Sequence, residues 1–212
     1  MSQRTVEDRL REEYFILLPE ARRVLEELEA EVRHSLLPLS SRLDKYERLV
    51  VTSRIKDCES ALRKLRPEGG IFDPDQADSY TLTALNDLAG VRVLVFPRSR
   101  WHEAEAALRR HEFFSSWKAD PVLADDQGEE PLAFKYYGYC SRNSKLRAEL
   151  QVVPMLIGLF WEVEHSAMYK PSPELKGVDV PLQPYRTDVY KALKAFESEF
   201  ERLVRRDPLK KL

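Results

Sequence analysis

Apolar residues near the N-terminus recur at steps of three and four residues, which is the spacing of one face of an α-helix. The stripe consists of Val6, Leu10, Leu17, Ala21, Val24, Leu28 and Val32. Pro19 falls within it, and proline fits the first turn of a helix but interrupts an interior turn. The pattern therefore predicts N-terminal helices over residues 5–45, divided at Pro19.

Four later segments have the composition of β-strands. Val91–Phe96 is an almost continuous apolar and β-branched run, which is typical of a buried strand. Phe113–Lys118 is a second candidate. Phe134–Cys140 and Leu146–Val153 are separated only by the polar residues 141–145, so they are predicted to form a hairpin.

Helical patterns alternate with these strands, and proline, glycine and acidic residues mark the loops 66–79 and 120–131. The predicted helices are Asp57–Leu65, Leu82–Leu88, Ser99–Arg110, Pro154–Tyr169 and Tyr185–Arg206. The last of them carries an apolar stripe made of Val189, Leu193, Phe196, Phe200 and Leu203. Helices flanking a small sheet predict an α/β or α+β fold with about four to five strands. We expect one domain over residues 1–212, with its core at 46–171 and a C-terminal helix at 185–206.

Composition excludes several classes of protein. The 212 residues carry 34 basic and 36 acidic side chains, so the chain is not a polycation that grips nucleic acid by net charge. No apolar run reaches the roughly 18 residues of a membrane span, and the charged N-terminus does not resemble a signal peptide. Two cysteines, Cys58 and Cys140, exclude a disulfide scaffold. A cytoplasmic protein that does not insert into membranes is the expectation.

Two carboxylates stand where a magnesium ion could be bound. Asp87 and Arg92 flank Gly90 at a predicted helix–strand junction, and Glu149 and Gln151 lie two apart on a predicted strand, so they face the same way. Paired with Asp87, Glu149 would form a two-carboxylate Mg²⁺ site of the kind that holds a nucleoside triphosphate. A surface ion pair at a helix end is the alternative for Asp87 and Arg92.

A cluster of cations and a hydroxyl precedes that junction. Lys56, Ser60 and Lys64 are four residues apart, so they are predicted to share one helix face, and Arg54 comes just before them. Such groups near a helix N-terminus can receive phosphates. A solvated basic face is the alternative. Near the end of a later predicted helix, His165 follows Glu164, where a capping or packing histidine is the alternative to a functional one.

Taken in order, these motifs resemble the synthetase domain of the RelA/SpoT family, and the length resembles its small single-domain alarmone synthetases. That family carries an arginine-x-lysine with a serine four residues on, then D-x-x-G-x-R, E-x-Q and E-H-x-x-x-Y-K. The matching residues here are Arg54, Lys56, Ser60, Asp87, Gly90, Arg92, Glu149, Gln151, Glu164, His165, Tyr169 and Lys170. The resemblance covers roughly residues 45–171 and implies a nucleotidyltransferase-like synthetase fold.

The resemblance implies transfer of the β,γ-pyrophosphate of ATP to the ribose 3′-hydroxyl of GDP or GTP, which makes the alarmone (p)ppGpp. Arg54 and Arg92 would sandwich adenine, while Lys56, Ser60 and Lys64 would hold the ATP phosphates. Asp87 and Glu149 would be the catalytic residues and the Mg²⁺ ligands. The acceptor would be bound by Tyr136, Tyr139, Gln151, Glu164 and His165.

The acceptor half departs from the family pattern. In place of G-Y-R-S-x-H, whose tyrosine stacks on guanine, the chain reads Gly138-Tyr139-Cys140-Ser141-Arg142-Asn143. Only nine residues separate Tyr139 from Glu149, so the stacking position falls either at Tyr139 or earlier, near Leu132–Tyr136. In E-x-Q-x-R-T the arginine is replaced by Val153.

These departures leave three interpretations open. The first is an alarmone synthetase with a guanine nucleotide as acceptor. The second is a toxin-type relative that pyrophosphorylates adenine nucleotides or the 3′ end of tRNA. Candidates for the basic surface that tRNA needs are Arg142, Lys145 and Arg147 on the hairpin, or Arg205, Arg206, Lys210 and Lys211 at the tail. The third is an inactive domain that binds a nucleotide or a partner. The resemblance also implies a homo-oligomer, or a partner protein such as an antitoxin.

Overall fold

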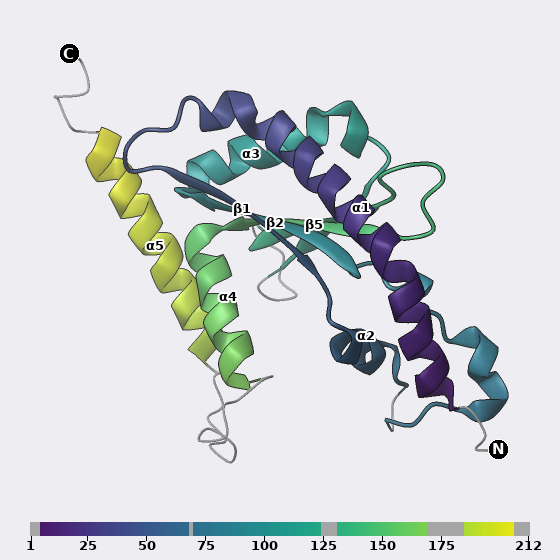
Figure 1. Ribbon diagram of the computed structural model, residues 1–212. Coiled ribbons are helices and arrows are strands. Elements are labelled where there is room, and N and C mark those ends of the chain that lie inside the picture. Colours follow the sequence, from purple (N-terminus) through teal and green to yellow (C-terminus); the bar gives the residue numbers. More distant parts are fainter. Residues whose placement is uncertain (1–4, 68–69, 124–130, 169–184, 206–212) are drawn as a thin grey trace.

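A five-stranded mixed sheet forms the centre of the computed structural model (Figure 1), which describes residues 5–67, 70–123, 131–168 and 185–205. The strands are β1 (Arg48–Ile55), β2 (Ala89–Phe96), β3 (Lys118–Val122), β4 (Ala133–Gly138) and β5 (Ala148–Pro154). Their spatial order is β1-β2-β5-β4-β3, and only β2 and β5 run parallel. The predicted small sheet flanked by helices is confirmed.

Helices cover both faces of this sheet (Figure 1). One face carries α1 (Val6–Ser40) and α3 (Arg98–Arg110), and the other carries α4 (Met155–Met168), against which α5 (Arg186–Arg205) packs. The short helix α2 (Cys58–Leu65) follows β1 and contacts α1. Three 3₁₀ turns lie at Pro74–Ser79, Leu82–Ala84 and Glu112–Phe114. Within the described residues, no helix is long and apolar enough to cross a membrane.

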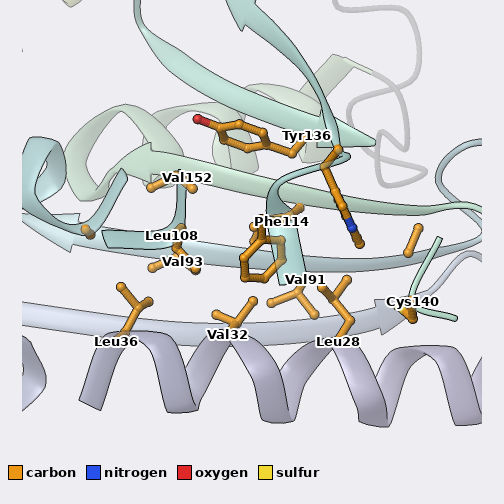
Figure 2. Packing of buried hydrophobic residues seen from close by; sticks show 14 of the residues in the cluster. Leu28, Val32, Leu36, Val91, Val93, Leu108, Phe114, Tyr136, Cys140 and Val152 are labelled. Atoms are coloured by element: carbon orange, nitrogen blue, oxygen red, sulfur yellow. The ribbon is translucent and has the colours of Figure 1, made fainter. Parts of the chain in front are cut away.

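The main core lies between the sheet and the α1–α3 layer. Alternate residues of a strand point to opposite faces, so Val91 and Val93 of β2 turn toward α1, where they meet Leu28, Val32 and other residues of its stripe (Figure 2). The remaining polar positions of β2 and β5 therefore fall on the opposite face. This alternation is what places the candidate site.

The prediction that Pro19 divides the N-terminal helix is wrong. A single helix continues from Val6 to Ser40 with Pro19 and Pro38 inside it. Pro19 leaves the carbonyl oxygen of Phe15 without its helical donor, but both residues are exposed, so water can bind that oxygen. The buried stripe meanwhile runs on through Leu17 and Ala21, and its packing outweighs the local cost of the proline.

Three further segments differ from the prediction. The helix expected at Leu82–Leu88 is only the 3₁₀ turn Leu82–Ala84. The strand expected at Phe113–Lys118 begins only at Lys118, because Phe114 and Trp117 pack edge to face in the core instead of alternating. The strand β1 had not been predicted, although Leu49 and Val51 alternate with polar neighbours there.

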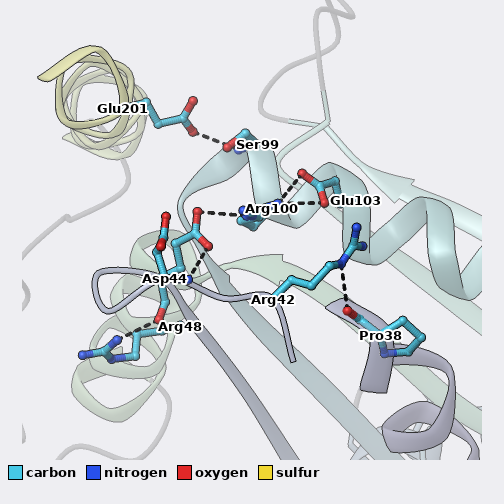
Figure 3. Close-up of polar contacts among 9 residues, drawn as sticks. Pro38, Arg42, Asp44, Arg48, Ser99, Arg100, Glu103 and Glu201 are labelled. Atoms are coloured by element: carbon cyan, nitrogen blue, oxygen red, sulfur yellow. Dashed lines mark hydrogen bonds and ion pairs between the residues drawn. The ribbon is translucent and has the colours of Figure 1, made fainter. Parts of the chain in front are cut away.

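The C-terminal helix turns only part of its apolar stripe inward: Leu193 packs on the cluster beneath α4, and the ring of Phe200 lies 5.0 Å from that of Phe96. Tyr190 and Glu197 are buried, whereas Phe196 and Leu203 are each 56% exposed. A hydrogen bond connects α5 to the start of α3. The carboxylate of Glu201 accepts it from the backbone N–H of Ser99 at 2.9 Å (Figure 3).

Candidate functional site

On the α4 face, the sheet changes from apolar to polar along two neighbouring strands. Leu94 of β2 and Val153 of β5 lie in the apolar cluster beneath α4. Toward the start of the same strands the same face carries Gly90, Arg92, Glu149 and Gln151. α4 does not cover this polar end, which forms a cleft of about 480 Å³. The cleft is lined by Thr52, Ser53, Arg54, Gly90, Val91, Arg92, Glu149, Gln151, Trp161, Glu162 and His165.

A chain of hydrogen bonds fixes the polar groups in the floor of the cleft. Arg92 Nε donates to Gln151 Oε1 at 2.8 Å, and Gln151 Nε2 donates to Glu149 Oε2 at 2.7 Å. Arg92 also pairs with Glu162 of α4 at 3.2 Å. Burial, and next the nearby charge of Arg54, lower the pKa of Arg92, and the carboxylates of Glu162 and Glu149 oppose that effect. Glu149 is therefore held in one orientation at the sheet surface.

Arg54 and Arg92 are diagonal neighbours on the antiparallel β1–β2 pair. Thr52 lies opposite Arg92, and Arg54 lies opposite Gly90. Diagonal positions on one face are separated by roughly 7–8 Å, which is about twice the contact distance of stacked planar groups. Two guanidinium groups at such a separation can hold an aromatic ring between them. The structure thus brings together the two arginines expected to sandwich a base.

Asp87 lies between two lysines at the end of the sheet. Lys64 Nζ is 2.7 Å and Lys56 Nζ is 3.0 Å from Asp87 Oδ2. Burial alone would raise the pKa of Asp87, but hydrogen bonds from Lys64 and Lys56 outweigh burial and lower it. The carboxylate is therefore ionised near neutral pH.

The local structure around Asp87 corrects two expectations. Asp87 does not end a helix but lies in the irregular segment that leads into β2. Lys56 is not on the face of α2, because Asp57 caps that helix and Lys56 precedes the cap. Lys56 and Lys64 nevertheless meet at Asp87. Ser60 is partly buried on α2, where its N–H donates to Asp57 Oδ1 at 2.9 Å.

Both tyrosines expected to bind the acceptor lie outside the cleft. Tyr136 is buried on the opposite face of the sheet, where its hydroxyl donates to Glu105 at 2.5 Å. Tyr139 follows the end of β4 and contacts Arg147. The tyrosine that faces the site is Tyr137, which lies directly opposite Glu149. Sequence reasoning missed it because four aromatic residues stand close together, and only the strand register shows which of them share a face with Glu149.

Glu164 and His165 lie at a second hollow beside the cleft, between α4 and α5. The carboxylate of Glu164 is buried and pairs with Arg186 of α5. His165 and Trp161 border both the cleft and this hollow of about 570 Å³, and Lys135 of β4 borders the hollow alone. Tyr169 and Lys170, which complete the expected motif, lie outside the described residues.

Two carboxylates and one unpaired oxygen fit a magnesium ion. Asp87 Oδ1 is buried without a hydrogen-bond partner, so it would be available to a cation. Within the described residues, no group of three or more His, Cys, Asp or Glu side chains is arranged around a metal position. Magnesium typically uses one or two carboxylates and completes its shell with water and substrate phosphates, so Asp87 and Glu149 suffice for it.

Val153 occupies the position at which the RelA/SpoT motif E-x-Q-x-R-T carries an arginine. Its side chain is fully buried in the apolar cluster beneath α4. A charged group there would lie under the helix, so in this chain the cations of the site come from β1, α2 and β2 instead.

Comparison with solved structures identifies the same fold in small alarmone synthetases. Small alarmone synthetase 1 from Bacillus subtilis superposes with a TM-score of 0.61 at 19% identity, covering 90% of this chain and 96% of that one. A GTP pyrophosphokinase family protein from Streptococcus pneumoniae gives a TM-score of 0.61 at 17% identity, with 94% and 95% covered. The Bacillus enzyme has also been solved with its product pppGpp and with AMPCPP, at TM-scores of 0.59 and 0.57. No protein-family model and no curated protein matches the sequence.

Proposed function

We propose that the protein transfers the β,γ-pyrophosphate of ATP to the 3′-hydroxyl of a guanine nucleotide. The observation that carries the proposal is the juxtaposition of an Arg54–Arg92 slot with Asp87, its two lysines and Glu149 at one end of one sheet face. A base between the arginines would direct its phosphates toward the lysines. The solved synthetases that share the fold support the same reaction class.

The residues of the site divide the work between donor and acceptor. Arg54 and Arg92 stack on adenine, and Lys56 and Lys64 neutralise the triphosphate once it displaces them from Asp87. Ser60 adds a hydroxyl near these phosphates. A magnesium ion on Asp87 and Glu149 would neutralise phosphate charge and align the triphosphate.

Transfer requires that the 3′-oxygen of the acceptor attack the β-phosphorus while the bond to the α-phosphate oxygen breaks and AMP leaves. Glu149 is placed to accept the proton of that hydroxyl, because Gln151 and Tyr137 fix its carboxylate at the cleft. The rest of the acceleration comes from positioning and charge neutralisation. The acceptor occupies the hollow bordered by His165 and Lys135, which shares His165 and Trp161 with the cleft that Glu149 lines.

A label-transfer assay tests the proposal. The full chain, Mg²⁺ and γ-³²P-ATP are incubated in parallel with GDP, GTP, ADP, ATP or bulk tRNA, and products are separated by chromatography. We expect label on GDP or GTP, and loss of transfer in Asp87→Asn and Glu149→Gln. Asp78→Asn, the same chemical change at an exposed position, is the matched control and should transfer at the wild-type rate.

Other outcomes would overturn the acceptor or the reaction. Label only on adenine nucleotides or tRNA would identify a different acceptor. The absence of transfer to every acceptor, with AMPCPP still binding, would show that the domain binds nucleotides without catalysing the reaction.

A further inference from the structure

An arginine at the end of the site is held by two uncharged side chains. Arg147 Nε donates to the hydroxyl of Tyr139 at 3.2 Å, and its NH1 donates to Asn86 Oδ1 at 3.3 Å. The guanidinium carbon lies 5.4 Å from the centre of the Tyr139 ring. Three contacts from neutral groups therefore orient the guanidinium without neutralising it.

This arginine belongs to the same end of the sheet as the catalytic carboxylates. Asn86 immediately precedes Asp87, and Arg147 stands two residues before Glu149, just ahead of β5. Tyr139 stands two residues after Tyr137, the cross-strand neighbour of Glu149. Arg147 thus extends the row of functional groups beyond the cleft, on the side where Lys56 and Lys64 gather at Asp87.

Arg147 differs in its pairing from three other cations of the site. Lys56 and Lys64 are paired with Asp87, and Arg92 is paired with Glu162. Among the residues that the structure describes, no carboxylate lies within ion-pair distance of Arg147. An exposed arginine that is pre-oriented yet unneutralised is suited to receive an anion, because little side-chain entropy is lost on binding and no existing ion pair has to break.

We infer that Arg147, oriented by Tyr139 and Asn86, binds a phosphate group of a nucleotide in the site. This inference rests on the proposed function, since ATP and the acceptor are its two possible sources of phosphate. A guanidinium fork matches a phosphate with two parallel hydrogen bonds. The ring of Tyr139 is itself 47% accessible, so this arginine lies where a nucleotide can reach it.

Binding measurements separate the two sources of phosphate. Isothermal titration calorimetry is performed on the full chain with AMPCPP and, separately, with GDP, and guanosine serves as the ligand without phosphate. We expect Arg147→Gln to weaken one of the two nucleotides on the order of tenfold, the loss of one charge-assisted contact. Guanosine binding should not change. Whichever nucleotide is weakened supplies the phosphate.

Two further variants distinguish a positioned arginine from general surface charge. Arg142→Gln removes an exposed arginine from the same hairpin and should leave both affinities at wild type. Tyr139→Phe removes only the hydroxyl that orients Nε, so it should weaken the same nucleotide by a smaller factor. The salt dependence of binding should become shallower in Arg147→Gln and stay unchanged in Arg142→Gln.

The inference and the proposed function fail separately. If Arg147→Gln binds both nucleotides like wild type, or if Arg142→Gln is weakened equally, the inference is overturned whether or not pyrophosphate transfer occurs. If binding depends on Arg147 but no acceptor is labelled, the phosphate site stands and the pyrophosphotransferase proposal falls. A chain that binds neither nucleotide overturns both.

Discussion

Tyr137 lies directly opposite Glu149 across the antiparallel pair of β4 and β5. Burial, and next the charge and hydrogen bonding of Glu149, raise the pKa of Tyr137 well above its usual value. The phenol therefore stays protonated throughout the working pH range and can donate to the carboxylate. Together with Gln151, which donates to Glu149 Oε2, it fixes the carboxylate from two sides.

This relationship predicts that Tyr137→Phe slows pyrophosphate transfer without unfolding the protein. The variant removes one hydrogen bond to a charged group, a loss of about 1.5–3 kcal/mol at most, so we expect kcat to fall roughly tenfold and the melting temperature to fall by only several degrees. Initial rates at saturating ATP check this. Tyr185→Phe, at an exposed position, is the control, and equal rates for both variants would contradict a role for Tyr137.

Two glycines between α4 and the sheet should respond differently to replacement by alanine. A Cβ at Gly158 would lie 2.3 Å from Leu94 Cδ2, so Gly158→Ala should force the buried side chain of Leu94 to shift and destabilise the protein by about 1–3 kcal/mol. At Gly90 the nearest atom would be 3.6 Å away. Gly90→Ala should fold normally and reduce activity, because its methyl group enters the cleft beside Glu149.

Thermal melts and transfer rates of the two alanine variants form the test. The predicted pattern is a lowered melting temperature for Gly158→Ala, and a wild-type melting temperature with a lowered rate for Gly90→Ala. A Gly90→Ala variant with full activity would mean that substrate does not approach this part of the floor.

The positions of the residues expected on the donor side follow more directly from the sequence than those of the residues expected on the acceptor side, for a physical reason. Asp87, Arg92 and Glu149 lie on or beside strands with strong apolar runs, so their faces follow from alternation. The face of Tyr136, Tyr137 and Tyr139 depends on the register between β4 and β5, and one residue of shift exchanges the faces. The pairing of Glu164 with Arg186 depends on where α5 docks, which local patterns do not encode.

Glu197 gives stability a dependence on pH. It is fully buried on α5, and both of its carboxylate oxygens lack hydrogen-bond partners. Burial raises its pKa from 4.5 to about 7, against the opposing charge of Arg98 on α3 and with a smaller contribution from Glu201 on α5. The folded state therefore favours the protonated acid.

Because the folded-state pKa lies above the unfolded value, the contribution of Glu197 is fully present below about pH 4.5 and is lost as the pH rises through about 7. The shift corresponds to about 3 kcal/mol at most. We expect Glu197→Gln to melt at a higher temperature than wild type at pH 8.5 and to show a flatter dependence on pH between 5 and 8.5. Differential scanning fluorimetry across this range measures both quantities.

The exposed Glu199 on the same helix supplies the control for this prediction. Glu199→Gln should retain the wild-type slope of melting temperature against pH. If the curves of wild type and Glu197→Gln run parallel, the buried carboxyl does not titrate in this range.

Arg54 and Arg92 face the same slot, but Arg92 also contacts other side chains of the site. We therefore expect the two arginines to have different effects on activity and stability when each is replaced. Arg54 is exposed on the edge strand β1, so Arg54→Ala should raise the KM for ATP on the order of tenfold by removing one stacking partner, at unchanged melting temperature. Arg92 also donates to Gln151 and pairs with Glu162. Arg92→Ala should therefore raise the KM, lower kcat through the loosened Gln151–Glu149 contact, and lower the melting temperature.

Arg92→Lys separates charge from stacking, because lysine keeps the positive charge but loses the planar fork. We expect it to restore the melting temperature in part and to leave the KM for ATP raised. Arg22→Ala, an exposed arginine on α1, is the control for nonspecific loss of charge and should match wild type in KM, kcat and melting temperature. A lysine variant with the wild-type KM would show that the slot attracts the nucleotide by charge and does not stack on its base.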